Sequence, residues 1–203
     1  MIKETTPGFV HLSKMKPFLM DSSIHMSGKT QFKVDDTVRY VMETYPDRDP
    51  EQVRFVSTVS LMAEQYIASY TNGTNDGAAE DLDDPYTYAY DVAMPSKYQG
   101  LRLEVKCSLS GKWINVKDAK DYPSRSGINL YSFRHHHVAD CIIILSVAEL
   151  DPGVFEYTPK VLTVREAFDK NQELVVRGRD RKSWYLRKER PWSMDEDIPL
   201  KLF

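Results

Sequence analysis

Cysteine is scarce in this sequence, and it has neither a long apolar run nor the apolar core of a signal peptide. The two cysteines, Cys107 and Cys141, lack the spacing of a metal site. Both fall in segments that resemble strands, so we expect two free thiols in a reducing compartment. No stretch approaches the ~18 apolar residues of a membrane span. These absences predict a cytoplasmic protein without a membrane segment.

The net charge is only −3, which argues against indiscriminate binding to nucleic acid. The average hides an asymmetry. Residues 1–100 hold 9 Lys/Arg and 15 Asp/Glu, whereas residues 101–203 hold 18 and 15. A chain with both kinds of charge can hold a metal ion with its acids and contact phosphates with its bases. With 203 residues, 41% of them hydrophobic, the chain can bury one core and form one domain, with or without an appended lobe.

The pattern along the chain divides it into three parts. Residues 1–48 predict an N-terminal arm, extended or loosely packed to residue 33, followed by a short helix capped by Asp35 or Asp36. Residues 49–170 predict the core, and residues 171–203 a basic and aromatic C-terminal extension packed on it. Asp49-Pro50-Glu51 is a strong helix start, and Asn72-Gly73 should end that helix. An acidic loop then reaches residue 85.

A sheet is predicted from residue 86 to residue 147, with a third strand at 112–116, a helix at 132–140 and a buried strand at 141–147. Further along, residues 160–164 suggest another strand and residues 165–170 a short helix. Residues 174–190 alternate well enough to form a hairpin. The expected fold class is therefore α/β, with a mixed central sheet flanked by helices and a C-terminal basic hairpin.

The most informative segment spans residues 91–106. Asp91 sits in a short apolar run, a glycine-containing turn follows, and Glu104 and Lys106 then flank Val105. On a strand Glu104 and Lys106 share one face, and Val105 points into the core. In a hairpin, Asp91 would lie one strand spacing away, roughly 5 Å. Two carboxylates and an ammonium would then converge, as a magnesium-dependent phosphodiesterase requires.

A plainer interpretation is that Glu104 and Lys106 are ordinary charges on a solvated strand face. The downstream strands favour the functional interpretation. With them, residues 91–106 resemble the PD-(D/E)xK nuclease superfamily, whose members share the restriction-endonuclease-like fold. In that family an acid on one strand is followed by Glu-x-Lys on the next, matched here by Asp91, Glu104 and Lys106.

The resemblance covers about residues 52–148. Members often carry an Ala-Asp pair before an apolar strand, as Ala139-Asp140 stands here, and many carry a Glu on the preceding helix, where Glu64 stands. One departure is Tyr90, where the family has proline. The resemblance implies Mg²⁺, for which Mn²⁺ could substitute, bound by Asp91, Glu104, the Val105 carbonyl and Glu64. Lys106 would then position the attacking water.

DNA is the expected partner. Between Arg177 and Arg190, seven cations in fourteen residues interleave with aromatic side chains, which suits a nucleic-acid surface but also a charged edge hairpin. His135-His136-His137 cannot all ligate one ion, because neighbouring residues on a helix project about 100° apart. The candidate DNA-binding residues are Lys112, Lys117, Lys120, Arg125, Arg134, His136, Arg179, Arg181, Lys182 and Arg187.

The sequence thus predicts a divalent-metal-dependent DNA endonuclease. Two alternatives stay open: a catalytically inactive DNA-binding or interaction protein on the same fold, and an exonuclease or branch-specific resolvase. A homodimer would suit cutting of both strands, whereas a monomer would suit nicking. No short motif encodes the recognised DNA sequence.

Overall fold

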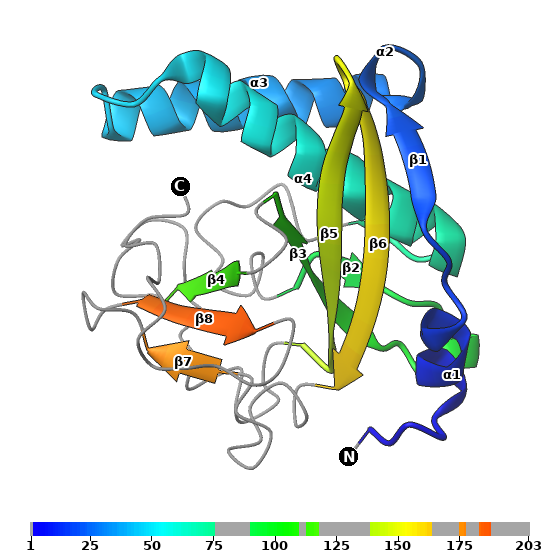
Figure 1. Ribbon diagram of the computed structural model, residues 1–203. Coiled ribbons are helices and arrows are strands. Elements are labelled where there is room, and N and C mark those ends of the chain that lie inside the picture. The colour runs from blue at the N-terminus through cyan, green and yellow to red at the C-terminus, as the bar shows by residue number, and fades with distance from the viewer. Residues whose placement is uncertain are drawn as a thin grey trace.

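The structure, a computed structural model, describes residues 2–75, 90–109 and 139–163 with their side chains, and the backbone of strands at 113–117, 175–177 and 183–187. Figure 1 shows a curled five-stranded sheet with helices packed on it and a smaller three-stranded sheet beside it. The mixed α/β class is therefore confirmed. Within the described residues, no helix is long and apolar enough to cross a membrane.

The larger sheet has the strand order β1-β6-β5-β3-β2. Only β3 and β5 run parallel to each other, and every other neighbouring pair is antiparallel, so the sheet is mixed as predicted. Its strands are β1 Phe18–Asp21, β2 Val92–Ala93, β3 Arg102–Ser108, β5 Cys141–Asp151 and β6 Val154–Thr163.

The strand predicted at 141–147 is confirmed as β5, but the strand predicted at 160–164 begins earlier. It starts at Val154, directly after a two-residue turn of Pro152 and Gly153 that joins it to β5. Gly153 has a φ of +80°, which favours glycine, and proline presets the position before it. The long β5–β6 hairpin crosses the whole molecule in Figure 1.

Helix α4, Pro50–Thr71, matches its prediction closely. The Asp49 side chain accepts a hydrogen bond of 2.9 Å from the backbone N–H of Glu51, and Asn72 ends the helix in the left-handed conformation. The helix packs across one face of the large sheet (Figure 1). Its buried residues meet the inward-facing side chains of β3 and β5, and they are Val59, Met62, Ala63, Ile67 and Thr71.

Helix α3, Gly28–Thr44, begins earlier than the sequence predicted. Its cap is Ser27, whose hydroxyl accepts a hydrogen bond of 3.1 Å from the backbone N–H of Thr30, and not Asp35 or Asp36. Gln65 of α4 explains the early start, because its side chain accepts hydrogen bonds from Ser27 and Thr30. A partner distant in sequence therefore sets this helix end.

The prediction that residues 1–33 are extended or loosely packed is wrong. They form α1 (Pro7–Ser13), β1 and α2 (Ser22–His25) before α3 begins. β1 pairs with β6 at the edge of the sheet, and Phe18 stacks on the buried ring of Tyr157 with centroids 4.9 Å apart. The N-terminal part therefore supplies core side chains to the same sheet as residues 92–163. The boundaries at 48 and 170 stay predictions.

The third predicted strand exists as β4, Trp113–Lys117, but it does not belong to the large sheet. It pairs antiparallel with β8 (Ser183–Arg187), which also pairs with β7 (Val175–Arg177). The predicted C-terminal hairpin is thus confirmed as β7–β8, and β4 completes a second sheet with it. The predicted helix at 165–170, the acidic loop from residue 76 and most of the predicted helix at 132–140 lie outside the described residues.

Candidate active site

The antiparallel pair of β2 and β3 brings Asp91 beside the Glu-x-Lys strand. The backbone N–H of Asp91 donates to the Leu103 carbonyl at 2.8 Å, and Val92 then pairs with Leu103. Asp91 Oδ2 accepts a hydrogen bond of 2.6 Å from the backbone N–H of Val105. The carboxylate therefore takes the place of a carbonyl of a partner strand as hydrogen-bond acceptor, and this bond holds Asp91 next to β3.

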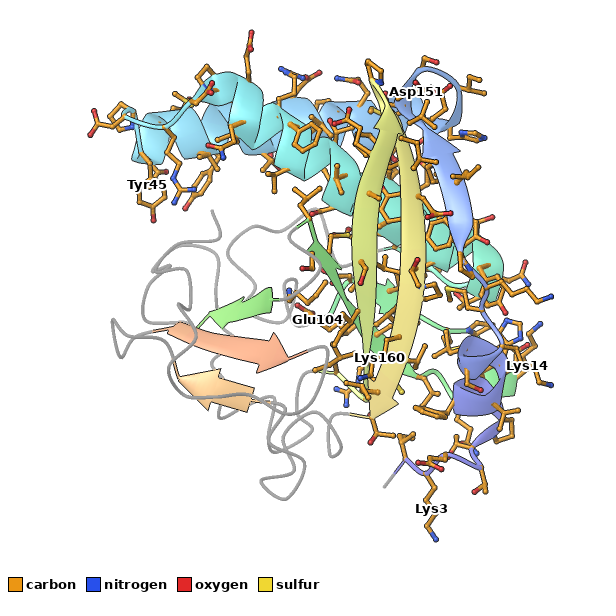
Figure 2. The ribbon with its side chains drawn as sticks, in the orientation of Figure 1. Lys3, Lys14, Tyr45, Glu104, Asp151 and Lys160 are labelled. Carbon is orange, nitrogen blue, oxygen red and sulfur yellow. The ribbon has the colours of Figure 1, made fainter. Side chains whose placement is uncertain are left out.

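The alternation along β3 follows the prediction. Leu103 and Val105 are buried in the core under α4, while Glu104 and Lys106 form an ion pair with each other. The side chain of Glu104 is 7% exposed and that of Lys106 is 29% exposed. Glu104 is labelled in Figure 2, on the side of the β5–β6 hairpin that faces the small sheet.

One carboxylate oxygen of this pair lacks a partner. Glu104 Oε1 meets the Lys106 ammonium, but Oε2 is buried and, among the described residues, accepts no hydrogen bond. Buried polar atoms without a partner are rare in folded proteins, and a missing ion is one ordinary reason for them. The unpartnered oxygen therefore has the character of a ligand position.

Glu64 of α4 joins the group from another element. Burial raises the pKa of Glu64 well above its ordinary value, and the neighbouring Asp91 raises it further, while Lys33 and Lys106 oppose the shift. The sequence prediction had Glu64 near the acid pair, and the structure puts it within electrostatic reach of Asp91 and Glu104. Its role as a ligand stays a prediction.

The carboxyls of the site hold their protons more tightly than free ones. Burial raises the pKa of Glu104 to about 8, with Asp91 adding to the shift and Lys106 opposing it. Burial also raises the pKa of Asp91, against the pull of Lys106 and the Val105 N–H. For Lys106, burial would lower the pKa, but Glu104 and Asp91 outweigh burial and raise it, so the amine stays charged. Burial therefore favours the uncharged forms of these carboxyls, and a cation bound among them would favour the ionised forms.

The donor chemistry fits a hard divalent cation. Within the residues described here, no three His, Cys, Asp or Glu side chains are grouped tightly enough to form a complete protein cage for a metal. Mg²⁺ seldom needs one, because it keeps several waters and is usually held by one or two carboxylates together with substrate phosphate. Asp91 and the unpartnered oxygen of Glu104 match that partial set.

An ion pair holds the start of the two parallel strands together. The Asp140 carboxylate, directly before β5, accepts hydrogen bonds from the backbone N–H of Arg102 at 2.9 Å and from its Nε at 3.2 Å. The backbone N–H of Asp140 donates back to the Arg102 carbonyl at 2.8 Å. This clamp fixes the register that puts Glu104 opposite Ile142, and the Ala139-Asp140 pair is its sequence signal.

The neighbouring thiol is not a nucleophile. Cys107 and Cys141 are both thiols that are not joined in a disulfide, as predicted. Burial raises the pKa of Cys107, and the nearby Glu64 raises it further. A thiol in such surroundings stays protonated and unreactive.

Sequence reasoning missed Lys33, a residue of α3 whose charge reaches Asp91 and Glu64. No local pattern marks it, because it reaches the site through helix packing. The predicted DNA-binding residues are not tested by the structure. The backbones of Lys117 and Arg187 lie in β4 and β8. The others lie outside the described residues, and they are Lys112, Lys120, Arg125, Arg134, His136, Arg179, Arg181 and Lys182.

Comparison with known proteins gives a consistent result. Residues 1–188 match the family described as Bacteriophage T4 endonuclease IV. A relative, "Endonuclease IV" of Enterobacteria phage T4, is 38% identical over 188 residues, which cover 91% of this chain and 99% of the relative. No solved structure matches the chain. The chain therefore belongs to the bacteriophage T4 endonuclease IV family.

Proposed function

We propose that this chain is a divalent-metal-dependent DNA endonuclease that hydrolyses phosphodiester bonds. Membership of an endonuclease family supports nuclease activity. The observation that carries the site is the meeting of Asp91, directly before β2, with Glu104 and Lys106 of β3, where Asp91 is hydrogen-bonded to the residue between the other two. Cation and carboxylates side by side suit phosphate chemistry.

The proposed cofactor is Mg²⁺, for which Mn²⁺ could substitute. Asp91 and Glu104 would hold it, with the Val105 carbonyl and Glu64 as further oxygen donors. When bound, the ion would polarise the scissile phosphate and lower the pKa of a coordinated water. The buried, unpartnered Oε2 of Glu104 supports this assignment.

The chain's own groups then have separate tasks. The Lys106 ammonium orients the attacking water and offsets the negative charge that grows on the phosphate oxygens. The Val105 N–H keeps Asp91 fixed throughout. The water oxygen bonds to phosphorus in line with the departing oxygen and releases a proton to solvent. The bond from phosphorus to the departing oxygen breaks, and that oxygen takes up a proton from solvent.

The proposal includes the restriction-endonuclease-like fold and the PD-(D/E)xK superfamily suggested by residues 91–106. The product ends implied by that resemblance are a 5′-phosphate and a 3′-hydroxyl. The order of the large sheet, with an antiparallel β2–β3 pair beside the parallel β3–β5 pair, agrees with such a site. DNA would cross the face of the sheet that carries Glu104 and reach the basic β7–β8 hairpin.

The test is digestion of supercoiled plasmid by the full chain with Mg²⁺, Mn²⁺ or EDTA. Wild type should nick or cut only with a divalent ion, while Glu104→Gln and Lys106→Met should lose cutting and keep their fold. Glu43→Gln and Lys14→Met are matched controls, because both residues are exposed and lie outside the cluster. Cutting by Glu104→Gln at the wild-type rate would refute the site.

Further substrates separate the alternatives. An endonuclease cuts closed circles, single-stranded or duplex, whereas an exonuclease needs a linear end and a resolvase prefers a four-way junction. An inactive binding protein would shift DNA in a gel without cutting it under any ion. The ratio of nicked to linear plasmid would report whether one or two strands are cut per encounter.

A further inference from the structure

A second lysine approaches the acid cluster from the opposite layer of the fold. Lys33 lies in α3, and its ammonium nitrogen stands 3.3 Å from Asn75 Oδ1 and 3.4 Å from the Asn75 carbonyl oxygen. The residue is half-buried. Its side chain therefore leaves its own helix and is directed at the segment after α4.

That segment is attached to the strand that Asp91 precedes. Thr74 pairs with Ala93 through two backbone hydrogen bonds, of 2.8 and 2.9 Å. Asn75 follows Thr74 directly, and Ala93 is two residues after Asp91. The contact with Asn75 thus holds the Lys33 ammonium near the beginning of β2.

The start of α3 is also fixed next to Glu64. Gln65 accepts a hydrogen bond from the Ser27 N–H at 3.1 Å and donates one of 2.6 Å to the His25 carbonyl. Because Gln65 follows Glu64 in α4, these bonds bring the first turns of α3 beside the turn that carries Glu64. Two independent sets of contacts therefore position Lys33 at the same cluster.

The two lysines act on the acids from different sides. Lys106 lies within electrostatic reach of Glu64, Asp91 and Glu104, whereas Lys33 affects Glu64 and Asp91. When the three carboxyls are ionised, they exceed the two ammonium groups by one negative charge. Without Lys33 the excess would be two negative charges, so Lys33 lessens the repulsion that a DNA phosphate meets before any metal ion is bound.

We propose that Lys33 contacts a phosphate of the bound DNA strand on the α3 side of the acid cluster, while Lys106 serves the scissile phosphate. The assignment rests on the proposed endonuclease function and adds a residue outside the PD-(D/E)xK pattern. Asn75 acts as the holder of the Lys33 side chain. A phosphate contact of this kind strengthens binding without reading the base sequence.

The test measures the salt dependence of DNA binding by the full chain in EDTA, with fluorescently labelled single-stranded and duplex oligonucleotides. Lys33→Gln is the main variant, because glutamine keeps a donor for Asn75 but removes the charge. In this variant the plot of log K against log salt should be less steep, with a slope about one unit less negative than in wild type. DNA binding should also be about 3- to 10-fold weaker at low salt. Lys33→Arg should keep the slope, and Lys33→Met should match Lys33→Gln.

Lys14→Met is the control for the loss of one positive charge. Figure 2 shows Lys14, the residue after α1, across the β5–β6 hairpin from Glu104, so the salt dependence of the Lys14→Met variant should equal that of wild type. The inference would be overturned if the salt dependence of Lys33→Gln equalled that of wild type. It would also be overturned if Lys14→Met reduced the salt dependence as much as Lys33→Gln does. Thermal unfolding of each variant checks that the fold is kept.

Cleavage by the same variants separates the two proposals. If Glu104→Gln and Lys106→Met are inactive while Lys33→Gln binds and cuts as wild type, only the role of Lys33 fails. If Glu104→Gln and Lys106→Met still cut, the proposed active site fails. The role of Lys33 then stands on the binding slope alone.

Discussion

The Asp91 carboxylate accepts a hydrogen bond of 2.6 Å from the backbone N–H of Val105, the residue between Glu104 and Lys106. The side chain thereby completes the edge of β3 and is fixed beside the other two candidate residues. Asparagine could make the same hydrogen bond, whereas alanine could not. The structural and the chemical roles of Asp91 can therefore be separated.

We expect Asp91→Asn to fold like wild type and to lose cleavage by at least about 10²-fold, because its amide oxygen accepts from Val105 but carries no charge for a metal. Asp91→Ala should also lose about 1–3 kcal/mol of stability, because the Val105 N–H is left unpaired. Urea unfolding and plasmid cleavage measure the two effects. A fully active Asp91→Asn variant would contradict the ligand role.

The raised pKa of Glu104 predicts how stability depends on pH without metal. Its pKa rises from an ordinary 4.5 to about 8 in the folded chain, so between these values the folded state binds more protons than the unfolded state. Stability must therefore fall as the pH rises through this window. The raised pKa values of Asp91 and Glu64 act in the same direction.

Urea unfolding in EDTA at pH 5 and at pH 8.5 tests this expectation. Wild type should lose free energy of unfolding between pH 5 and pH 8.5. In Glu104→Gln this loss should be smaller by at least about 1.4 kcal/mol, the equivalent of one pKa unit. An identical pH dependence in wild type and variant would show that Glu104 is not held in a proton-retaining environment.

A divalent ion should stabilise the folded chain, because the site exists only when Asp91 and Glu104 are brought together. At a Mg²⁺ concentration about 100 times the dissociation constant, the gain is about 2.7 kcal/mol. Thermal unfolding with and without Mg²⁺ measures it. Glu104→Gln should show little gain, whereas Glu43→Gln should respond as wild type does. Equal gains in both variants would place the ion elsewhere.

Gly73 lets the end of α4 approach β2 closely. A Cβ at this position would stand 2.5 Å from the Ala93 carbonyl oxygen and 2.8 Å from Thr71 Oγ1. Gly73→Ala should therefore displace β2, with a loss of about 1–3 kcal/mol and reduced cleavage, because Asp91 precedes that strand.

Gly28→Ala is the matched control for Gly73→Ala. A Cβ at Gly28, the first residue of α3, meets no atom within 4 Å. The substitution should leave stability unchanged or slightly raised. Equal losses in the two variants would mean that the close approach at Gly73 has no special importance.

Local signals in the sequence were sufficient for several elements. The Asp49-Pro50 start and the Asn72-Gly73 end delimit α4, because capping and turn residues act within one helical turn. The apolar run from Cys141 predicts β5, since a short run rich in β-branched residues is typical of a buried strand. The Pro152-Gly153 pair is also a local signal for a turn, although the sequence prediction did not use it.

Elements whose position depends on partners distant in sequence could not be predicted from the sequence. β1 is a four-residue strand whose place is set by its pairing with β6, and β4 belongs to the second sheet because β8 pairs with it. The beginning of α3 is set by Gln65. In each case the deciding contact lies tens of residues away, so no local pattern records it.

The sequence by itself predicted that Asp91, Glu104 and Lys106 share one neighbourhood, because residues i and i+2 of a strand share a face and the connection over residues 94–101 allows the two strands to pair. Glu64 was only suggested by the family resemblance and Lys33 was marked by no pattern, so the tertiary structure decided that they join the group. Their approach depends on the packing of α3 and α4 against the sheet. Burial by that packing also removes the carboxyls from water and raises their affinity for protons, which no residue pattern specifies.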